Sequence, residues 1–389
     1  MASVGILGEI LSKNCIKRDE GASYMLNFKV FSFSLILALA AVVSPRASAR
    51  DDIADIDDLE SRIDDLMQDY DGDNIPGAAV AIYSDEHILF QKNYGLRNLE
   101  SRELVTSDTN FRTASLTKAF TATAILQLVE AEKVQLQASL TEIFKDFPTY
   151  GKGITLHHLL SHTSGLLDYE NLLPSDSSKQ VTDRDVLEIM KRQRSTYFSP
   201  GTRFRYSNTG YAILAEIVSA VSGKKFHQYL VEHIFEPLGM DATLAYVQGE
   251  NSISNRAYGY SMLTSGYKRS DQSQTSAVLG DGGIYSSTMD LRNWHVMWTG
   301  GSSVLTSESS IIMTTPKKLN NGSDTQYGYG WFVDMFDGNR RISHTGSTVG
   351  QKHSIAIFPE KKLGIVILTN RQNSAPWLIT DKLAHLLLK

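Results

Sequence analysis

The stretch "HSIAIFPEKKLGIVILTN", residues 353–370, predicts two strands joined by a turn. Its apolar runs, 353–358 and 363–370, are short and rich in Ile and Val, and "PEKK" separates them. Short β-branched runs bounded by turn residues are typical of an antiparallel hairpin. A segment with helical periodicity follows from Ala375 to Leu388.

The beginning of the chain carries a similar pattern. The runs "AAVAIY" (78–83) and "HILFQKNYG" (87–95) flank turn residues and predict a second hairpin. Residues 51–70 precede it with apolar side chains at helical spacing. Strands are therefore expected near both ends of the chain.

The middle of the chain has a different periodicity. Residues 115–300 are dominated by helical spacing with Gly, Pro and Ser breaks, and the Ser-rich stretches near 252–276 and 302–310 predict loops. The expected fold class is α/β (α+β): an antiparallel sheet built from both chain ends and flanked by helices, with a mostly helical insertion. We expect the sheet part at about 50–114 and 325–389, and the helical part at about 115–324.

Composition narrows the classes of function. The 389 residues are 42% apolar and 21% charged, which is enough to bury a large core in one or two domains. The formal charge is −5 and no long basic run occurs, which argues against a nucleic-acid groove or a basic membrane face. The expected partner is a small-molecule or peptide substrate.

The N-terminal stretch "MLNFKVFSFSLILALAAVVSPRASA", residues 25–49, is typical of a signal peptide with cleavage after Ala49. A retained membrane anchor is the alternative, but the apolar run of 14 residues is short for a span. Residues 1–24 do not fit in front of a signal peptide, so we expect the native start at Met25. The product would be an exported domain of residues 50–389, periplasmic or secreted, and cleavage would remove Cys15, the only cysteine.

Ser-x-x-Lys occurs three times, at Ser115, Ser222 and Ser265. Only Ser115 opens a long apolar helical pattern, where residues i and i+3 share a face, so its hydroxyl and the Lys118 amine can meet. A serine hydroxyl is a weak nucleophile that needs a neighbouring base. The pattern alone is also compatible with two ordinary polar residues on a surface helix.

Two further motifs favour catalysis. Tyr206-Ser207-Asn208 stands in a turn-rich loop before a helical pattern, and the run from His344 to Ser347 stands beside a predicted strand. With Ser115 and Lys118, these motifs resemble the serine penicillin-recognising hydrolases: class C β-lactamases, DD-peptidases and related esterases and D-peptidases. The segments "LLSHTSGL" (159–166), "EPLGM" and "YGYGW" are similar to family segments too, and the likeness covers about the whole chain after residue 49.

The resemblance implies a β-lactamase/transpeptidase-like fold and a reaction through an acyl-enzyme on Ser115. Lys118 and Tyr206 would share the acid/base steps: Lys118 could be neutral and accept the proton, or stay charged and favour an ionised Tyr206. By the same resemblance, Asn208 would orient the substrate amide.

The strand motif would complete the site. The main-chain N–H groups of Ser115 and Ser347 would form the oxyanion hole, while His344, Thr345 and Gly346 would line the substrate position, with His344 and Thr345 receiving a substrate carboxylate.

His344 departs from class C β-lactamases, which typically have a permanently charged lysine there. We therefore expect slow or no antibiotic hydrolysis and a DD-peptidase or D-amino-acid peptidase-like enzyme. Arg340 or Arg341 is a candidate for the missing cation. A class C-like β-lactamase, a carboxylesterase and a non-catalytic protein that binds penicillin or peptidoglycan peptides stay open as alternatives.

No cofactor or metal is expected. His158 and His162 are four residues apart, but no glutamate follows the first histidine and no third ligand is apparent, so both are interpreted as structural. "DYDGDN" (69–74) resembles a calcium loop superficially, yet Asn74 and Val80 replace its glycine and its bidentate glutamate.

Overall fold

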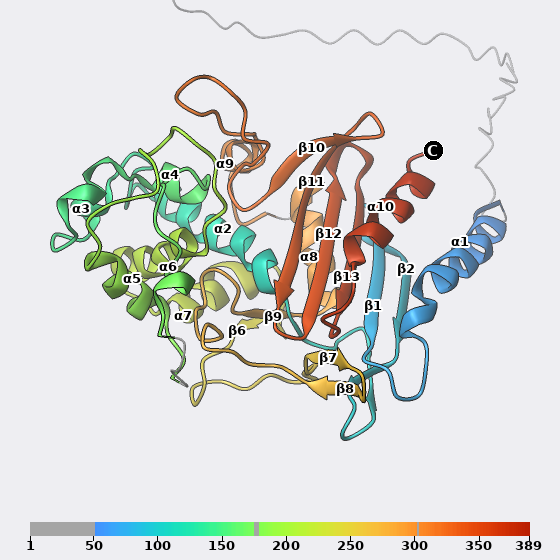
Figure 1. Cartoon of the computed structure of the whole chain (residues 1–389). Coiled ribbons are helices and arrows are strands. Elements are labelled where there is room, and N and C mark those ends of the chain that lie inside the picture. The colour runs from blue at the N-terminus through green and yellow to red at the C-terminus, as the bar shows by residue number, and fades with distance from the viewer. Residues whose placement is uncertain (1–50, 175–178, 302) are drawn as a thin grey trace, which may run out of the picture. The chain divides into compact units, whose positions relative to one another are not determined.

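The computed structural model describes residues 51–174, 179–301 and 303–389, and its main feature is a six-stranded antiparallel sheet built from both ends of that region (Figure 1). The strand order is β10-β11-β12-β13-β1-β2. These strands are β1 (Ala78–Ser84), β2 (His87–Tyr94), β10 (Phe332–Phe336), β11 (Asn339–Thr348), β12 (Gln351–Phe358) and β13 (Leu363–Thr369). Both predicted hairpins are present, and β13 joins them by pairing with β1. The predicted signal peptide, start site and Cys15 lie outside the described residues.

The two faces of the sheet follow the alternation along β1. Val80 and Ile82 belong to a buried cluster with α1 (Asp51–Met67) and α10 (Pro376–Leu387), which cover one face. Ala81 and Tyr83 belong to the larger cluster on the opposite face, where α8 (Thr288–Trp298) packs against β1 and β13. Because successive strand side chains point to opposite faces, one strand contributes to both cores.

The helical part lies beyond the other face of the sheet, away from α1 and α10 (Figure 1). Its centre is α2 (Thr117–Glu130), which is buried almost all round and packs against α6 (Asn208–Ser222). The remaining helices of this part are α3 (Leu140–Ile143), α4 (Leu156–Leu160), α5 (Asp183–Lys191), α7 (Phe226–Leu230) and α9 (Ser307–Met313). A helix buried on nearly all sides is a core helix, so α2 is the central helix of this part.

Short strands accompany the helices. A three-stranded sheet of order β5-β9-β6 and two hairpins, β3–β4 and β7–β8, complete the described fold. They are β3 (Leu96–Asn98), β4 (Glu103–Leu104), β5 (Phe111–Arg112), β6 (Leu244–Ala245), β7 (Tyr260–Leu263), β8 (Gly266–Arg269) and β9 (Ile284–Ser286).

Two stretches predicted as loops are partly regular. Residues 252–276 include the β7–β8 hairpin, in which only Tyr260 is buried, so the regular alternation of buried and exposed side chains is missing. Within 302–310, α9 begins at Ser307, and the Thr306 side chain accepts the Ser309 N–H as its N-cap. Three of the serines that suggested a loop, Ser307, Ser309 and Ser310, therefore lie in the first turn of a helix capped by Thr306.

Candidate active site

Ser115 lies in a single 3₁₀ turn, Ala114–Leu116, immediately before α2. The preceding Ala114 has φ of +50°, a left-handed conformation that is uncommon for a residue with a Cβ. Such outliers concentrate at functional sites, where the surrounding structure holds them. The turn leaves Ser115 partly exposed while its neighbours Ala114 and Leu116 are buried.

Lys118 is fully buried in the first turn of α2. Its Nζ lies 3.1 Å from Ser115 Oγ, 2.9 Å from Asn208 Oδ1 and 2.7 Å from the Asp281 carbonyl oxygen. Three acceptors match the three N–H bonds of an ammonium group. The structure therefore brings two of the sequence motifs together around one buried amine.

Tyr206 and Asn208 come from the start of α6, where Ser207 is the N-cap and its side chain accepts the Gly210 N–H. The Lys118 Nζ lies 4.9 Å from the centre of the Tyr206 ring. The Tyr206 hydroxyl is buried and has no hydrogen-bond partner among the described residues. A buried hydroxyl without a partner costs free energy unless a ligand or water completes it, so this oxygen is available to a reacting group.

The strand motif alternates between the two sides of β11. Thr345 and Ser347 are exposed, whereas His344 and Gly346 are buried. A Cβ added at Gly346 would lie 2.4 Å from the Thr113 carbonyl oxygen, so this glycine lets β11 approach the segment that carries Ser115. Ser115 and Ser347 line one small cavity of about 80 Å³.

His344 is only 3% exposed, and its Nε2 lies 3.2 Å from the Tyr327 hydroxyl. Burial, with a smaller contribution from Lys118, lowers the pKa of His344 to about 3, so the ring is neutral at physiological pH. Its ring centre is 6.0 Å from that of Tyr206. The ring of His344 therefore lies beside the ring of Tyr206. The expected contact of His344 with a substrate carboxylate stays a prediction.

The expectation that Arg340 or Arg341 supplies a cation to the cleft is wrong. Arg341 forms ion pairs with Asp334 and Asp381, and Arg340 bonds Thr314 and pairs with Glu360. These partners lie at the end of β11 away from His344, and they hold both guanidinium groups there.

The cation beside the motif is Lys352, on the neighbouring strand. It stands opposite Ser347 in the β11–β12 register, and its Nζ donates to Ser347 Oγ at 2.6 Å. Cross-strand neighbours share a face, which sequence spacing alone does not reveal.

Acidic side chains line the other side of the cavity. Glu170 accepts a hydrogen bond from Asn208 Nδ2 at 2.7 Å and forms no ion pair within the described ranges. Asp281 is almost fully buried, accepts from the Tyr169 hydroxyl, and has its pKa raised to about 6 by burial, an effect that Lys118 partly opposes. Asp168, which lines an adjoining cavity, is paired with Arg205. Glu170 and Asp281 therefore both line the cavity without an ion pair within the described ranges, and Glu170 is the more exposed of the two.

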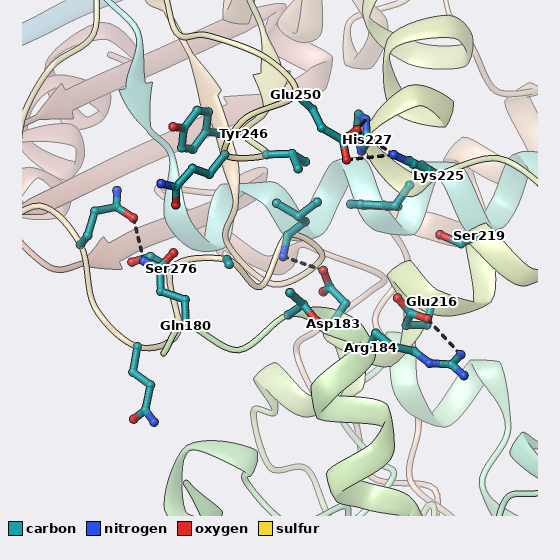
Figure 2. Close-up of a pocket in the computed structure, with 18 of the residues that line it drawn as sticks. Gln180, Asp183, Arg184, Glu216, Ser219, Lys225, His227, Tyr246, Glu250 and Ser276 are labelled. Atoms are coloured by element: carbon teal, nitrogen blue, oxygen red, sulfur yellow. Dashed lines mark hydrogen bonds and ion pairs between the residues drawn. The ribbon is translucent and has the colours of Figure 1, made fainter. Parts of the chain in front are cut away.

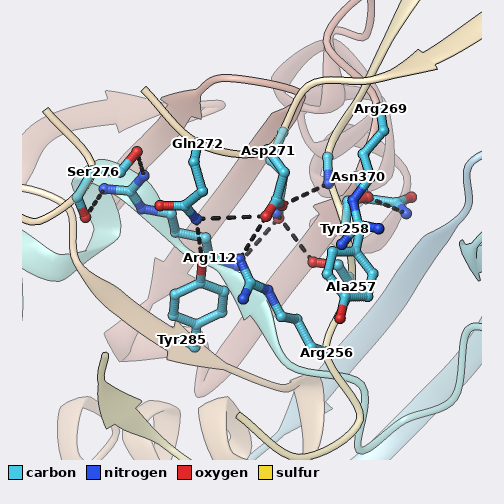
Figure 3. A network of polar contacts seen from close by, with 12 residues as sticks. Arg112, Arg256, Ala257, Tyr258, Arg269, Asp271, Gln272, Ser276, Tyr285 and Asn370 are labelled. Carbon is cyan, nitrogen blue, oxygen red and sulfur yellow. Dashed lines mark hydrogen bonds and ion pairs between the residues drawn. The ribbon is translucent and has the colours of Figure 1, made fainter. Parts of the chain in front are cut away.

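A buried arginine holds the segment that carries Asp281 (Figure 3). Arg112 donates to the Gly282 carbonyl through Nε and to Ser276 Oγ and the Ser276 carbonyl through its two Nη atoms. Next to it, Arg256 pairs with Asp271 (Figure 3). A planar guanidinium that donates to several acceptors restrains the backbone that carries them. Here it restrains Gly282, the residue that follows the Asp281 carbonyl group to which Lys118 donates.

A much larger cavity, about 1100 Å³, lies elsewhere, between α5, α6, the start of α7 and the loops that contain Tyr246 and Ser276 (Figure 2). Among its charged side chains, Lys225 pairs with Glu250 and Arg184 with Glu216, whereas Asp183 accepts the Leu279 and Gly280 N–H groups. No residue of the three sequence motifs lines it. Size alone therefore does not identify the site, and the chemistry lies in the small cavity at Ser115.

His158 and His162, the two histidines at helical spacing, make separate contacts within the protein. His158 Nδ1 lies 3.2 Å from the Thr155 amide nitrogen in the capping box of α4, whereas the ring of His162 lies among Tyr206, Tyr211 and Tyr327. No cluster of three or more potential metal ligands occurs in the described part of the chain.

Comparison with known proteins identifies the family of this chain. The family model described as Beta-lactamase matches residues 59–389. The chain belongs to the beta-lactamase family. Within it, penicillin-binding protein 4* of Bacillus subtilis is 28% identical over 306 residues, 75% of this chain and 67% of the relative. The D-aminopeptidase of Brucella anthropi is 26% identical over 327 residues, 82% of this chain and 60% of the relative.

A solved structure of the family agrees with the fold. The octameric penicillin-binding protein homologue from Pyrococcus abyssi matches with a TM-score of 0.73 and 30% identity, covering 86% of this chain and 78% of that one. The predicted β-lactamase/transpeptidase fold is thus confirmed, and the chain is a beta-lactamase-family relative of penicillin-binding proteins and a D-aminopeptidase. No described helix has the length and apolar character needed to cross a bilayer.

Sequence reasoning missed four side chains of this beta-lactamase-family site: Arg112, Glu170, Asp281 and Lys352. Glu170 stands in the loop that follows "LLSHTSGL", where no pattern marks it, and Asp281 contributes partly through its backbone carbonyl. Lys352 was recognisable only from the strand register.

Proposed function

We propose that this chain is a serine hydrolase that forms an acyl-enzyme on Ser115 and acts on amides or short peptides of D-amino acids with a free amino group. The observation that carries the hydrolase assignment is the buried Lys118 amine, which contacts both Ser115 Oγ and Asn208 Oδ1. The D-aminopeptidase relative, at 26% identity, supports the substrate class.

In the proposed acylation, Ser115 Oγ attacks the substrate carbonyl carbon and its proton passes to an ionised Tyr206. The Lys118 Nζ lies 4.9 Å from the centre of the Tyr206 ring and 3.1 Å from Ser115 Oγ, so the proposed base and the nucleophile meet around one buried amine. The tetrahedral oxyanion is stabilised by the Ser115 and Ser347 N–H groups, and the departing amine takes the proton from Tyr206. Water then attacks the ester with Tyr206 as base, which releases the acid and restores Ser115.

Glu170 favours a substrate with a cationic amino group. Its carboxylate is partly buried, accepts one hydrogen bond from Asn208 and lines the cavity at Ser115. A partly buried charge without a counter-ion is stabilised when a ligand supplies the opposite charge. This argues against a substrate whose only charge is a carboxylate, as in a penicillin, and supports slow antibiotic hydrolysis.

The alternatives predict different behaviour. A class C-like β-lactamase would turn over penicillins rapidly, and a carboxylesterase would prefer esters without an amino group. A non-catalytic binding protein would leave all of them intact, although such a protein has no need for the buried amine beside Ser115.

The test uses the chain from Arg50 onward. D-Alanine p-nitroanilide, its L-enantiomer, an uncharged ester and a penicillin are compared by initial rate, and intact mass is followed over time with and without Ser115→Ala. We expect the D-amide to be hydrolysed fastest and any acyl adduct to vanish in Ser115→Ala. Fastest hydrolysis of the penicillin or of the uncharged ester would replace the proposal with the corresponding alternative.

Export is part of the proposal and rests on residues 25–49 of the sequence. Expression of the full chain with an N-terminal mass measurement tests it. We expect a product that begins at Arg50.

A further inference from the structure

His162 contacts the main chain on both sides of Tyr206. Its carbonyl oxygen accepts the Arg205 N–H at 2.9 Å, and its Nδ1 accepts the Ser207 N–H at 3.1 Å. Residues 205 and 207 are thus each bonded to the same residue, which comes from a segment about 45 positions earlier.

The imidazole ring of His162 also packs on the Tyr206 ring. The two ring centres are 4.2 Å apart with a tilt of 35°. The rings of Tyr211 and Tyr327 lie 5.0 and 4.6 Å from His162, and the histidine is fully buried. Offset contacts of this kind restrict how far an aromatic ring can turn.

The backbone of His162 is itself unusual, with φ of +58°. A left-handed conformation is unfavourable for a residue with a Cβ and persists where surrounding contacts fix it. The contacts that fix it here include the two hydrogen bonds to residues 205 and 207.

Acceptance by Nδ1 requires a neutral ring with its proton on Nε2, because the Ser207 amide can only donate. Burial, followed by the electrostatic effect of Lys118, lowers the pKa of His162 well below its usual value. In a protonated ring, Nδ1 would carry a hydrogen, and two N–H groups, those of His162 Nδ1 and Ser207, would face each other.

We propose that His162 is a positioning residue for the reaction: it fixes residues 205–207 and the Tyr206 ring, so that the Tyr206 hydroxyl meets the proton of Ser115. This inference rests on the proposed acid/base role of Tyr206. That hydroxyl has no hydrogen bond of its own within the described residues, so its position depends on the ring and backbone contacts. A misplacement of about 1 Å can lower a rate by about 100-fold.

Two substitutions separate the hydrogen bond from the ring contact. His162→Phe keeps an aromatic ring but removes the acceptor for Ser207. His162→Asn loses the ring but offers Oδ1 as an acceptor near the former Nδ1, and asparagine tolerates the left-handed backbone. The control is His295→Asn in α8, a buried histidine that contacts Tyr83 and Gly364 rather than the site.

The rates are measured with the D-amide and normalised to the folded fraction. We expect His162→Phe to lower kcat by about 100-fold with KM changed less than about threefold, and His162→Asn to recover kcat to within about tenfold of the parent chain. His295→Asn should lower the melting temperature but leave kcat per folded molecule unchanged. The proposal is overturned if His162→Phe keeps the kcat of the parent chain. It is also overturned if His162→Phe and His162→Asn lose kcat to the same extent.

A second measurement needs no variant to be active. Proton–nitrogen correlation spectra of the parent chain with ¹⁵N-labelled histidine report the tautomer of each ring, and His162→Asn assigns the signal. We expect the Nε2–H tautomer for His162 between pH 6 and 8. An Nδ1–H tautomer would remove the acceptor and refute the inference. If no substrate is hydrolysed, the proposed function fails, and the tautomer still decides whether His162 accepts from Ser207.

Discussion

Glu170 is the side chain to which we assign the selection of the substrate class. It faces the cavity at Ser115 as a carboxylate without an ion pair in the described part of the chain, and Asn208 supplies its hydrogen bond. Asn208 in turn accepts from Lys118, so one residue links the carboxylate proposed for substrate recognition to the buried amine.

Glu170→Gln should therefore change selectivity. The amide keeps an oxygen for Asn208 but loses the negative charge, and a hydrogen bond to a charged group contributes about 1.5–3 kcal/mol. We expect kcat/KM for D-alanine p-nitroanilide to fall by about 10- to 100-fold, with little change for the N-acetylated amide. Asp168→Asn is the matched control, since Arg205 already neutralises that carboxylate. Equal losses for both substrates would show that Glu170 acts through Asn208 alone.

Asp281 gives a pH-dependent contribution to stability. Burial raises its pKa from 3.8 to about 6, so the folded state holds this proton more tightly than the unfolded state does. The protonated form of Asp281 adds to the free energy of unfolding, and this contribution is fully present below pH 4. The contribution, up to about 3 kcal/mol, is lost as the pH rises toward 6. Asp281→Asn removes that loss, because the amide stays neutral.

Urea unfolding of the parent chain and Asp281→Asn at pH 4, 5, 6 and 7 measures the difference. We expect the variant to gain stability relative to the parent as the pH rises from 4 to 6 and then to level off. Asp65→Asn, on the exposed side of α1, should follow the parent curve. A constant difference at every pH would contradict a raised pKa of Asp281.

At the scale of elements, the contact of β11 with the turn that carries Ser115 sets the geometry of the cleft. The closest approach is at Gly346, where a Cβ would meet the Thr113 carbonyl oxygen at 2.4 Å and His353 Cδ2 at 3.0 Å. A backbone oxygen cannot move aside as a flexible side chain can. The strand and the turn must therefore separate to admit a larger residue.

Gly346→Ala should lower the acylation rate of Ser115 by about 10- to 100-fold and cost about 1–3 kcal/mol of folding free energy. Single-turnover mass spectrometry and thermal unfolding measure the two effects. Gly153→Ala is the control, because the atom nearest to its Cβ would be Pro200 Cγ at 4.0 Å. An unchanged acylation rate in Gly346→Ala would show that β11 does not define the oxyanion geometry.

At the scale of the whole molecule, the sheet joins the two ends of the described region, and α1 and α10 cover its outer face (Figure 1). Leu383 of α10 is fully buried there, in one cluster with Val80 and Ile365. The active site lies on the other side of the sheet, against the helical part. Stability and catalysis are thus supported by different layers of the fold.

Leu383→Ala should cost about 2–5 kcal/mol of folding free energy by leaving a cavity between α10 and the sheet. The kcat per folded molecule should stay at the parental value, since none of the site residues belongs to the buried cluster of this layer. Denaturant unfolding and rate measurements on one preparation test both statements, with the exposed Lys382→Ala as control. A fall in kcat that matches the loss of stability would mean that the outer layer also shapes the cleft.

The sequence by itself determined the sheet at both chain ends, the helical insertion, and the three motifs around Ser115, Tyr206 and His344. These features have local signals: β-branched alternation, helical periodicity, and fixed spacing of reactive residues. It did not predict the β7–β8 hairpin, in which only Tyr260 is buried and the regular alternation is missing, or α9, whose capping residues resemble a loop.

Only the tertiary structure decided which charges face the cleft. Arg340 and Arg341 are held elsewhere by their carboxylate partners, whereas Lys352 reaches Ser347 through the strand register and Glu170 reaches the cavity from an unpatterned loop. It also placed His162 against Tyr206, across 43 intervening positions. These facts depend on contacts between distant segments and on burial, and neither is encoded in the spacing of residues along the chain.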